Sequence, residues 1–498
     1  MTRSITIEDL YAFKFLSRPR LSPDGGRVAF VVTTIDQRAH AYRSAIWMMP
    51  AEGGAAVRLV GGPRNAQSPA WSPDGRWLAF VSDREFHDES GTHRGLDKQR
   101  DERVGRPQGS PLPSRPNPGK GKSQIWILPT DGGEAQQLTF MPHGANNPTW
   151  SPDSSCLLFT AQVGPLDEEF HDESGTHDGK PLPKARVIDR SFYRLDGTGF
   201  IYERRQHLFL ADIKGSEPRQ LTDGDWDDKD AMWSPDGRHI AFTSSRGEDR
   251  WHLPCADLYT LAVDTCRGSG LSLPEQPLRL TDGTRNCVSP SWSPDGQSIA
   301  FLAARKYRSG GQVELFTIAV DDAARAGLDL HPMKLGRCPY TLCNLTEDFE
   351  GSCADWTNSD MTNEQLRPPP AWSSDGRTLY VLAVQRGATR VYAVSSDGAG
   401  TQPPVVTPGN IHALDFSMDA ARQHMAVLIE TPRHIAEIFM TSPASQDTGQ
   451  PGQSHQPGQP DQPPQPGQPD QPPQPGQPQG VAPTIHDDGA LRRLEQPT

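Results

Sequence analysis

Short apolar stretches alternate with polar turns along most of this chain, and one such pattern recurs. In its clearest copy, Trp-Ser-Pro-Asp-Gly at 71–75 is followed by Arg-Trp-Leu-Ala-Phe at 76–80. Alternating apolar and polar positions over five residues predict a β-strand. Within the motif, Pro fixes φ at the first turn position, the Asp carboxylate can accept backbone N–H groups, and Gly takes a positive φ. The pattern therefore predicts a turn between two strands.

The same turn and strand return at uneven intervals. Copies begin at Ser22, Trp71, Trp150, Trp233, Trp292 and Trp372, with a divergent copy at Phe416. Each unit also has a second half, in which an apolar strand leads through a turn to a strand ending Leu-Thr, as at 137–139, 220–222 and 279–281. Units of four short strands, too long for a solenoid turn, are typical of propeller blades. We therefore predict an all-β, seven-bladed β-propeller with long loop insertions.

The C-terminal region has a different composition. From about 448 to 479 the chain is an array of Pro-Gly-Gln-Pro and Asp-Gln-Pro-Pro units with almost no apolar side chains, a composition typical of disordered or polyproline-like segments. Residues 487–494 resemble the Gly turn and closing strand of earlier units. We thus expect a propeller at 1–440, a disordered Gln/Pro-rich insertion or linker at 441–480, and a remnant of the last blade strand at 481–498. A spacer is favoured over a ligand for proline-recognising domains.

Composition excludes several classes of function. The 498 residues carry a formal net charge of -13 without blocks of Lys or Arg, which argues against nucleic acid or anionic membrane as the main partner. No apolar run approaches the ~18 residues of a membrane span, and residues 1–11 do not read as a signal peptide. The seven cysteines show no paired spacing, and their odd number predicts mostly free thiols in a reducing compartment. A cytoplasmic location is expected.

Two groups of residues have the chemistry of metal ligands, and neither has the spacing of a metal site. His331, Cys338, Cys343 and Cys353 could supply zinc ligands, but they match no closed zinc motif, and buried thiols in a loop are the favoured interpretation. The octapeptide Phe-His-Asp-Glu-Ser-Gly-Thr-His occurs at 86–93 and again at 170–177, beside Gly/Pro-rich sequence. We interpret it as a small duplication forming solvated loops. We predict no metal and no cofactor.

A resemblance to a known family enters with the stretch Asp-Arg-Ser-Phe-Tyr-Arg-Leu-Asp-Gly-Thr-Gly-Phe at 189–200. Together with 204–209, 219–224 and the opening at 7–25, it resembles the propeller of acylaminoacyl-peptidase-like members of the prolyl oligopeptidase family. The resemblance covers roughly residues 5–440. The Ser-Pro-Asp-Gly repeats alone are shared with TolB-like propellers, so the 193–222 region is the more specific part.

The resemblance implies a serine peptidase whose triad lies in an α/β-hydrolase domain after the propeller. The propeller of such an enzyme covers the active site, excludes folded proteins and admits short peptides. This sequence holds no Gly-x-Ser-x-Gly nucleophile elbow, and a near match at 452–456 lacks the second Gly. We therefore assign no catalytic residue, and enzymatic activity stays open. Tyr193, Arg194 and Arg204 are candidate substrate-binding residues, because a guanidinium can pair with a peptide carboxylate or carbonyl. The structural alternative is that the arginines bridge loops and the tyrosine packs between blades.

Two interpretations from different classes follow. In the first, the chain is the gating and substrate-filtering half of a serine peptidase, truncated and without its catalytic domain, and its partners are short peptides and the missing hydrolase domain or another protein. The uncovered blades would then expose an apolar surface and favour self-association. In the alternative, the chain is a stand-alone TolB-like propeller that binds peptides or proteins. The stop just after a strand that resembles the last blade favours the first.

Overall fold

The computed structural model describes the repeated strands and most of the short turns between them. The residues described are 6–62, 64–84, 122–165, 171–177, 180–183, 187–191, 193–195, 199–201, 203–215, 217–247, 255–263, 276–305, 312–320, 342–354, 368–398, 405–407, 409–443 and 492–494. A short 3-10 helix, η1 (Ile7–Ala12), precedes the first strand.

Antiparallel sheets of four strands make up most of the fold. The first two are β1 (Phe15–Leu21), β2 (Arg27–Asp36), β3 (Ala41–Pro50) and β4 (Val57–Val60), then β5 (Ala66–Trp71), β6 (Trp77–Ser82), β7 (Gln124–Pro129) and β8 (Gln136–Gln137). The third joins β9 (Ala145–Trp150), β10 (Cys156–Val163), β15 (Arg205–Asp212) and β16 (Arg219–Gln220). The fourth and fifth are β17 (Asp228–Trp233), β18 (His239–Ser244), β19 (Asp257–Ala262) and β20 (Leu278–Arg279), then β21 (Arg285–Trp292), β22 (Ser298–Arg305), β23 (Val313–Ala319) and β24 (Leu342–Asn344).

A larger sheet holds the remaining repeats. It contains β25 (Ser352–Cys353), β26 (Ala371–Trp372), β27 (Thr378–Gln385), β28 (Ala388–Ser395), β29 (His412–Met418), β30 (Met425–Thr431), β31 (His434–Thr441) and β32 (Arg492–Arg493). A single parallel pair, Thr389 with His412, joins β28 to β29, so the sheet divides there into two groups of antiparallel strands. Two hairpins, β11 (His171–His177) with β12 (Lys180–Pro183) and β13 (Arg194–Leu195) with β14 (Gly199–Phe200), lie outside the main sheets.

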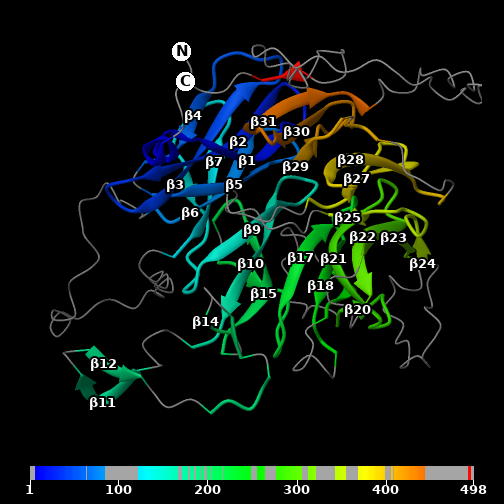
Figure 1. The fold of residues 1–498 in the computed structure, drawn as a ribbon. Coiled ribbons are helices and arrows are strands. Elements are labelled where there is room, and N and C mark those ends of the chain that lie inside the picture. Colours follow the sequence, from blue (N-terminus) through cyan, green and yellow to red (C-terminus); the bar gives the residue numbers. More distant parts are fainter. Residues whose placement is uncertain are drawn as a thin grey trace, which may run out of the picture.

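The sheets are arranged in a ring, as a β-propeller requires (Figure 1). The first strand of each main sheet contacts the first strand of the next, from β1 through β5, β9, β17 and β21, so these strands form the inner layer. β1 also contacts β29, β30 and β31, which brings the first and last repeats side by side. The prediction of an all-β propeller is confirmed. The number of seven blades stays a prediction, since it depends on counting the larger sheet as two blades.

The repeated motif forms the turn that its residues predict. In the copy at 71–75, the Ser72 hydroxyl donates to Asp74 Oδ1 at 2.6 Å and accepts the Trp77 N–H at 2.9 Å. Asp74 Oδ1 in turn accepts the Arg76 N–H at 3.1 Å, and Gly75 has φ +71°. Serine and aspartate thus hold the turn through the backbone, and the roles predicted for Asp and Gly are confirmed.

The tryptophan of the motif connects successive sheets. The indole Nε1 of Trp71 donates to the Arg20 carbonyl of the preceding sheet at 2.8 Å, and that of Trp150 donates to the Ala70 carbonyl at 3.0 Å. Trp233 and Trp372 make the equivalent bond, to the carbonyls of Thr149 at 3.4 Å and Ser291 at 3.1 Å, whereas the Nε1 of Trp292 is buried without a hydrogen-bond partner among the described residues. In these four copies, a residue that the sequence marks as part of a turn therefore also links neighbouring inner strands.

The Leu-Thr endings have a recurring role in the backbone. The Thr139 hydroxyl accepts the N–H of Ile125 at 2.9 Å, and Thr281 accepts that of Leu258 at 3.0 Å. In both cases an amide at the start of a third strand, buried between sheets, is satisfied by a side chain instead of a strand partner. Thr222, Thr346 and Thr407 make the same bond in other repeats. Buried amides need such partners.

Chain connections divide between the two ends of the ring. The Trp-Ser-Pro-Asp-Gly turns join first to second strands at one end, which we call the turn end. Second and third strands are joined at the opposite end, where residues 83–123 and 164–204 leave the second and third sheets. We call this the insertion end. The hairpin β13–β14 belongs to the second of these segments.

The structure describes five of the seven cysteines and part of the two groups of candidate metal ligands. Cys156 is disulfide-bonded, whereas Cys255, Cys287, Cys343 and Cys353 are not in disulfides, so most of the described cysteines are free thiols, as predicted. His331, Cys338 and the octapeptide at 86–93 lie outside the described residues, and 171–177 forms β11. Within the described parts of the chain, no group of three or more potential ligands could hold a metal ion.

Candidate functional site at the insertion end

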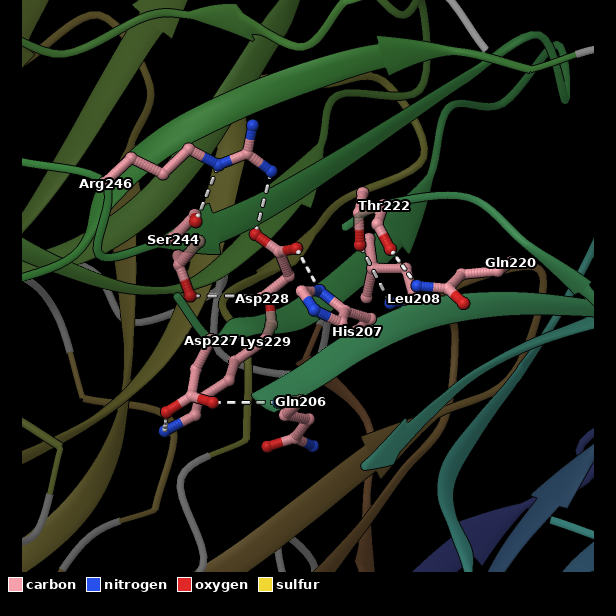
Figure 2. A network of polar contacts seen from close by, with 11 residues as sticks. Gln206, His207, Leu208, Gln220, Thr222, Asp227, Asp228, Lys229, Ser244 and Arg246 are labelled. Carbon is pink, nitrogen blue, oxygen red and sulfur yellow. Dashed lines mark hydrogen bonds and ion pairs between the residues drawn. The ribbon is translucent and has the colours of Figure 1, made fainter. Parts of the chain in front are cut away.

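A buried carboxylate lies between the third and fourth sheets at the insertion end (Figure 2). Asp228 begins β17, and its side chain is 0% exposed. Its Oδ1 accepts from Arg246 Nη2 at 2.9 Å, and its Oδ2 lies 3.2 Å from His207 Nδ1 on β15. Arg246 Nε also donates to the Ser244 hydroxyl at 2.9 Å. One carboxylate therefore joins the third strand of one sheet to the first two of the next.

The protonation of Asp228 follows from this environment. Burial raises the pKa of the carboxyl, but the hydrogen bond with His207, the charge of Arg246 and the hydroxyls of Ser244 and Thr222 outweigh it. The net pKa lies below the ordinary value, so the group is a carboxylate at neutral pH. This ionised form holds the two sheets together.

Arg246 is also enclosed by aromatic rings. Its Cζ lies 5.5 Å from the ring centroid of Phe242, 5.0 Å from that of Tyr259 and 4.9 Å from that of Trp226. A guanidinium over an aromatic face is attracted by the ring quadrupole, more strongly where water is excluded. With 15% of its side chain exposed, Arg246 is fixed by rings as well as by Asp228. The fixed guanidinium and carboxylate make this a structural junction and leave neither free for a ligand.

A second ionic cluster attaches the inserted segment to the ring. The carboxylate of Asp225 forms ion pairs with Nε of Arg205 on β15 and with Nη2 of Arg190, each at 3.0 Å. Arg190 belongs to the segment that leaves the third sheet, and Asp225 to the loop before β17. These ion pairs attach the end of the inserted segment near Arg190 to the boundary between the third and fourth sheets, where Asp228 lies. Sequence reasoning missed this cluster, although the acidic run Asp-Trp-Asp-Asp-Lys-Asp at 225–230 marks it.

The candidate substrate residues lie near this base. Tyr193 is 37% exposed and its ring centroid is 6.3 Å from that of Phe200 on β14. The Cζ of Arg194 lies 5.9 Å from the same ring. Arg204 instead donates from Nε to the carbonyl of Pro165 at 2.9 Å, across the two ends of the segment. The structure thus groups Tyr193 and Arg194 around Phe200 and gives Arg204 a bridging contact, while binding of substrate by any of the three stays a prediction.

The chain is similar to peptidases in both sequence and fold. Over 450 residues, 90% of the chain, it is 27% identical to the uncharacterized peptidase YuxL of Bacillus subtilis, of which it spans 58%. The structure superimposes on the acylaminoacyl peptidase of Pyrococcus horikoshii with a TM-score of 0.55 and 15% identity, over 86% of this chain and 52% of the other. The chain resembles the propeller of acylaminoacyl-peptidase-like members of the prolyl oligopeptidase family.

Two further findings concern the extent of the similarity. The chain spans little more than half the length of these two proteins, and no family model matches it. A shorter match, 34% identical over 131 residues, links 25% of the chain to 29% of the TolB homolog of Chlorobium chlorochromatii. At 15% identity, the similarity to the Pyrococcus horikoshii structure shows a shared fold and nothing beyond it. Among the described residues, no helix has the length and apolar character needed to cross a membrane.

Proposed function

We propose that this chain is the gating propeller of a serine peptidase that acts on short peptides. The observation that carries the proposal is the match to the peptidase YuxL over 90% of this chain but 58% of the relative. In this proposal the propeller is the part that the two proteins share, and the hydrolase with its nucleophile is supplied by another domain or another protein. A cytoplasmic location is part of the proposal.

The contact between first and last repeats supports a filtering role. Arg20 Nη1 donates to Asp415 Oδ2 at 2.8 Å, and the N–H of Leu21 donates to the Ser417 hydroxyl at 2.9 Å. Apolar side chains of β1, β2, β30 and β31 pack in one buried cluster across the same boundary. A ring joined in this way covers an active site as one body, so it discriminates substrates by size. We propose that Tyr193 and Arg194, at the insertion end, touch the peptide.

The first test concerns the catalytic half. Translation of the source DNA beyond the codon for Thr498 in all three forward frames should reveal a Gly-x-Ser-x-Gly elbow followed by Asp and His. Unrelated sequence in every frame would contradict a hydrolase domain encoded by the same gene. The chain itself should neither react with a fluorophosphonate probe nor hydrolyse acetyl-alanine anilide, because it has no nucleophile elbow. Labelling of the chain alone would show that a nucleophile has been overlooked.

The second test concerns gating. A protein that joins this propeller to its hydrolase should cleave an acetylated tripeptide anilide and spare the same tripeptide displayed on a folded domain. The hydrolase without residues 1–440 should lose this discrimination by size. Equal discrimination with and without the propeller would refute gating while leaving the peptidase activity intact.

The TolB-homolog match favours one alternative, a stand-alone propeller that binds peptides or proteins. The oligomeric state of the chain, measured by light scattering, distinguishes the gating propeller from the stand-alone module. Blades that normally face a hydrolase should self-associate when uncovered. A monodisperse monomer over a wide concentration range would favour the independent binding module.

A further inference from the structure

The second and fourth sheets share a structural position for an arginine, but they differ in what surrounds it. In the second sheet Phe80 pairs with Trp126, and Arg84 comes four residues after Phe80. In the fourth sheet Phe242 pairs with Tyr259, and Arg246 comes four residues after Phe242. Arg84 stacks over its two rings as Arg246 does, with Cζ 5.7 Å from the centroid of Phe80 and 5.1 Å from that of Trp126.

The partner of the arginine is missing from the second sheet. In the fourth sheet, Asp228 pairs across the strands with Ser244 and binds Arg246. In the second sheet, Ala66 pairs in the same register with Ser82. A buried methyl group therefore occupies the position from which Asp228 neutralises its arginine.

The histidine that supports Asp228 is replaced as well. Gln206 donates its N–H to Asp227, the residue before Asp228, at 2.8 Å. Ser44 likewise donates its N–H to Asn65, the residue before Ala66, at 3.0 Å. The next residue is His207 in one sheet and Ala45 in the other. The acid that binds the guanidinium in the fourth sheet and the histidine that contacts this acid are thus both alanines in the second.

Arg84 and Trp126 consequently lack acceptors. Arg84 is half-buried, and within the described chain its guanidinium makes neither an ion pair nor a side-chain hydrogen bond, only its contacts with the two rings. Trp126 is 4% exposed, and its Nε1 is buried without a hydrogen-bond partner in the structure. Burial lowers the pKa of Arg84, but an arginine keeps its charge in proteins. A cation and a neighbouring N–H donor are therefore both unsatisfied at the insertion end.

We propose that Arg84 and the indole N–H of Trp126 bind a carboxylate group of a peptide. The ligand carboxylate would supply what Asp228 supplies two sheets away. A guanidinium presents paired N–H donors that match a carboxylate, and the indole adds a third donor. The inference extends the proposed function, because it names a subsite for short peptides. Binding is nevertheless measured on this chain itself, so its failure would leave the gating proposal standing.

The experiment is isothermal titration of the full chain with three probes: acetyl-trialanine as the free acid, the same peptide as the C-terminal amide, and acetyl-Ala-Glu-Ala-amide. The free acid should bind at least tenfold more tightly than the trialanine amide if the site takes a C-terminal carboxylate. Tighter binding of the glutamyl amide would instead identify an acidic side chain as the source. Equal affinity for all three probes, or no saturable binding of any, would overturn the proposal.

Variants tie the binding to the site. Arg84→Gln should weaken the binding of whichever acidic peptide binds more tightly at least tenfold. Trp126→Phe, which keeps a ring without the N–H, should weaken it about fivefold. Arg76→Gln, an exposed arginine on the same sheet at the turn end, removes the same charge and should change nothing. Unchanged affinity in Arg84→Gln, or equal losses in both arginine variants, would overturn the assignment.

A grafted carboxylate provides the converse test. Ala66→Asp introduces the acid of the fourth sheet, which should pair with Arg84 and reduce acid binding at least tenfold. Ala66→Asn adds almost the same volume without the charge and should reduce it much less. If either variant fails to fold, as melting curves would show, the Arg84 and Trp126 variants still decide the question.

Discussion

Replacement of Asp228 by Asn tests whether the buried carboxylate holds neighbouring sheets together. Asn keeps the size and one acceptor oxygen but removes the charge that neutralises Arg246, whose side chain is 15% exposed. Removal of one partner of a buried ion pair costs about 3–5 kcal/mol, because the other charge is left uncompensated. The rings around Arg246 still stabilise its cation, so we expect a value near the lower limit, about 3 kcal/mol of unfolding free energy.

The effect should depend on pH in a defined direction. The pKa of Asp228 is lowered from 3.8, since the contacts with His207 and Arg246 outweigh burial. A depressed native pKa contributes stability that is present above the unfolded pKa and lost as pH falls through the native one. The difference between wild type and Asp228→Asn should therefore be full at pH 7 and narrow below about pH 4.

The assay is equilibrium unfolding in urea, followed by tryptophan fluorescence and by far-ultraviolet circular dichroism. Asp227→Asn is the matched control: Asp227 is adjacent, accepts the Gln206 N–H at 2.8 Å, and is 32% exposed. It should cost less than about 1 kcal/mol, since surface charges contribute little. Equal losses in both variants, or an Asp228→Asn loss that does not shrink in acid, would refute the reasoning.

Three further predictions follow from features of the ring. Thr139→Val should cost about 1–2 kcal/mol in the same assay, because the buried N–H of Ile125 loses its acceptor; an unchanged midpoint would show that the amide finds another. Gly75→Ala should cost about 1 kcal/mol through φ +71° alone, since nothing lies within 4 Å of the added Cβ; a neutral result would contradict this. Burial raises the pKa of Asp415 despite the charge of Arg20, so ionised Asp415 opposes folding at pH 7 and does so less toward pH 4. Arg20→Gln should therefore lower the melting temperature more at pH 7 than at pH 5, and the reverse order would refute the sign.

Local features of the fold were predictable from sequence because their causes are local. The Ser-Pro-Asp-Gly turn closes through hydrogen bonds within six residues, so its geometry could be deduced from one copy. The third copy shows the limit of that reasoning. Ser154 stands where five other copies have Gly, takes φ +58°, and accepts the Asp74 N–H of the preceding sheet at 3.1 Å. A bond between sheets compensates there for an unfavourable backbone angle, and a single repeat cannot reveal it.

The candidate site was predictable only in part for the same reason. Tyr193 and Arg194 could be selected because they lie in one distinctive stretch. The contact of Asp228 with His207 joins residues from different sheets and depends on how the sheets pack. Sequence alone does not show that Ala66 occupies the position of the acid Asp228. The equivalence emerges only from the strand register, in which each residue pairs with a serine of the second strand.

The last strand of the ring has a consequence for how the chain could be divided. β32 pairs with β31 through Arg493 with Phe439 and Arg492 with Met440, and Leu494 is buried in the cluster between the first and last repeats. Residues 444–491 thus begin and end at neighbouring strands. Proteolysis anywhere between them would turn the final residues into a separate peptide, held by one short strand pairing, the ion pair of Arg493 with Glu437 and the buried side chain of Leu494. Such a nicked protein would behave as a two-fragment complex, whose completeness depends on peptide concentration.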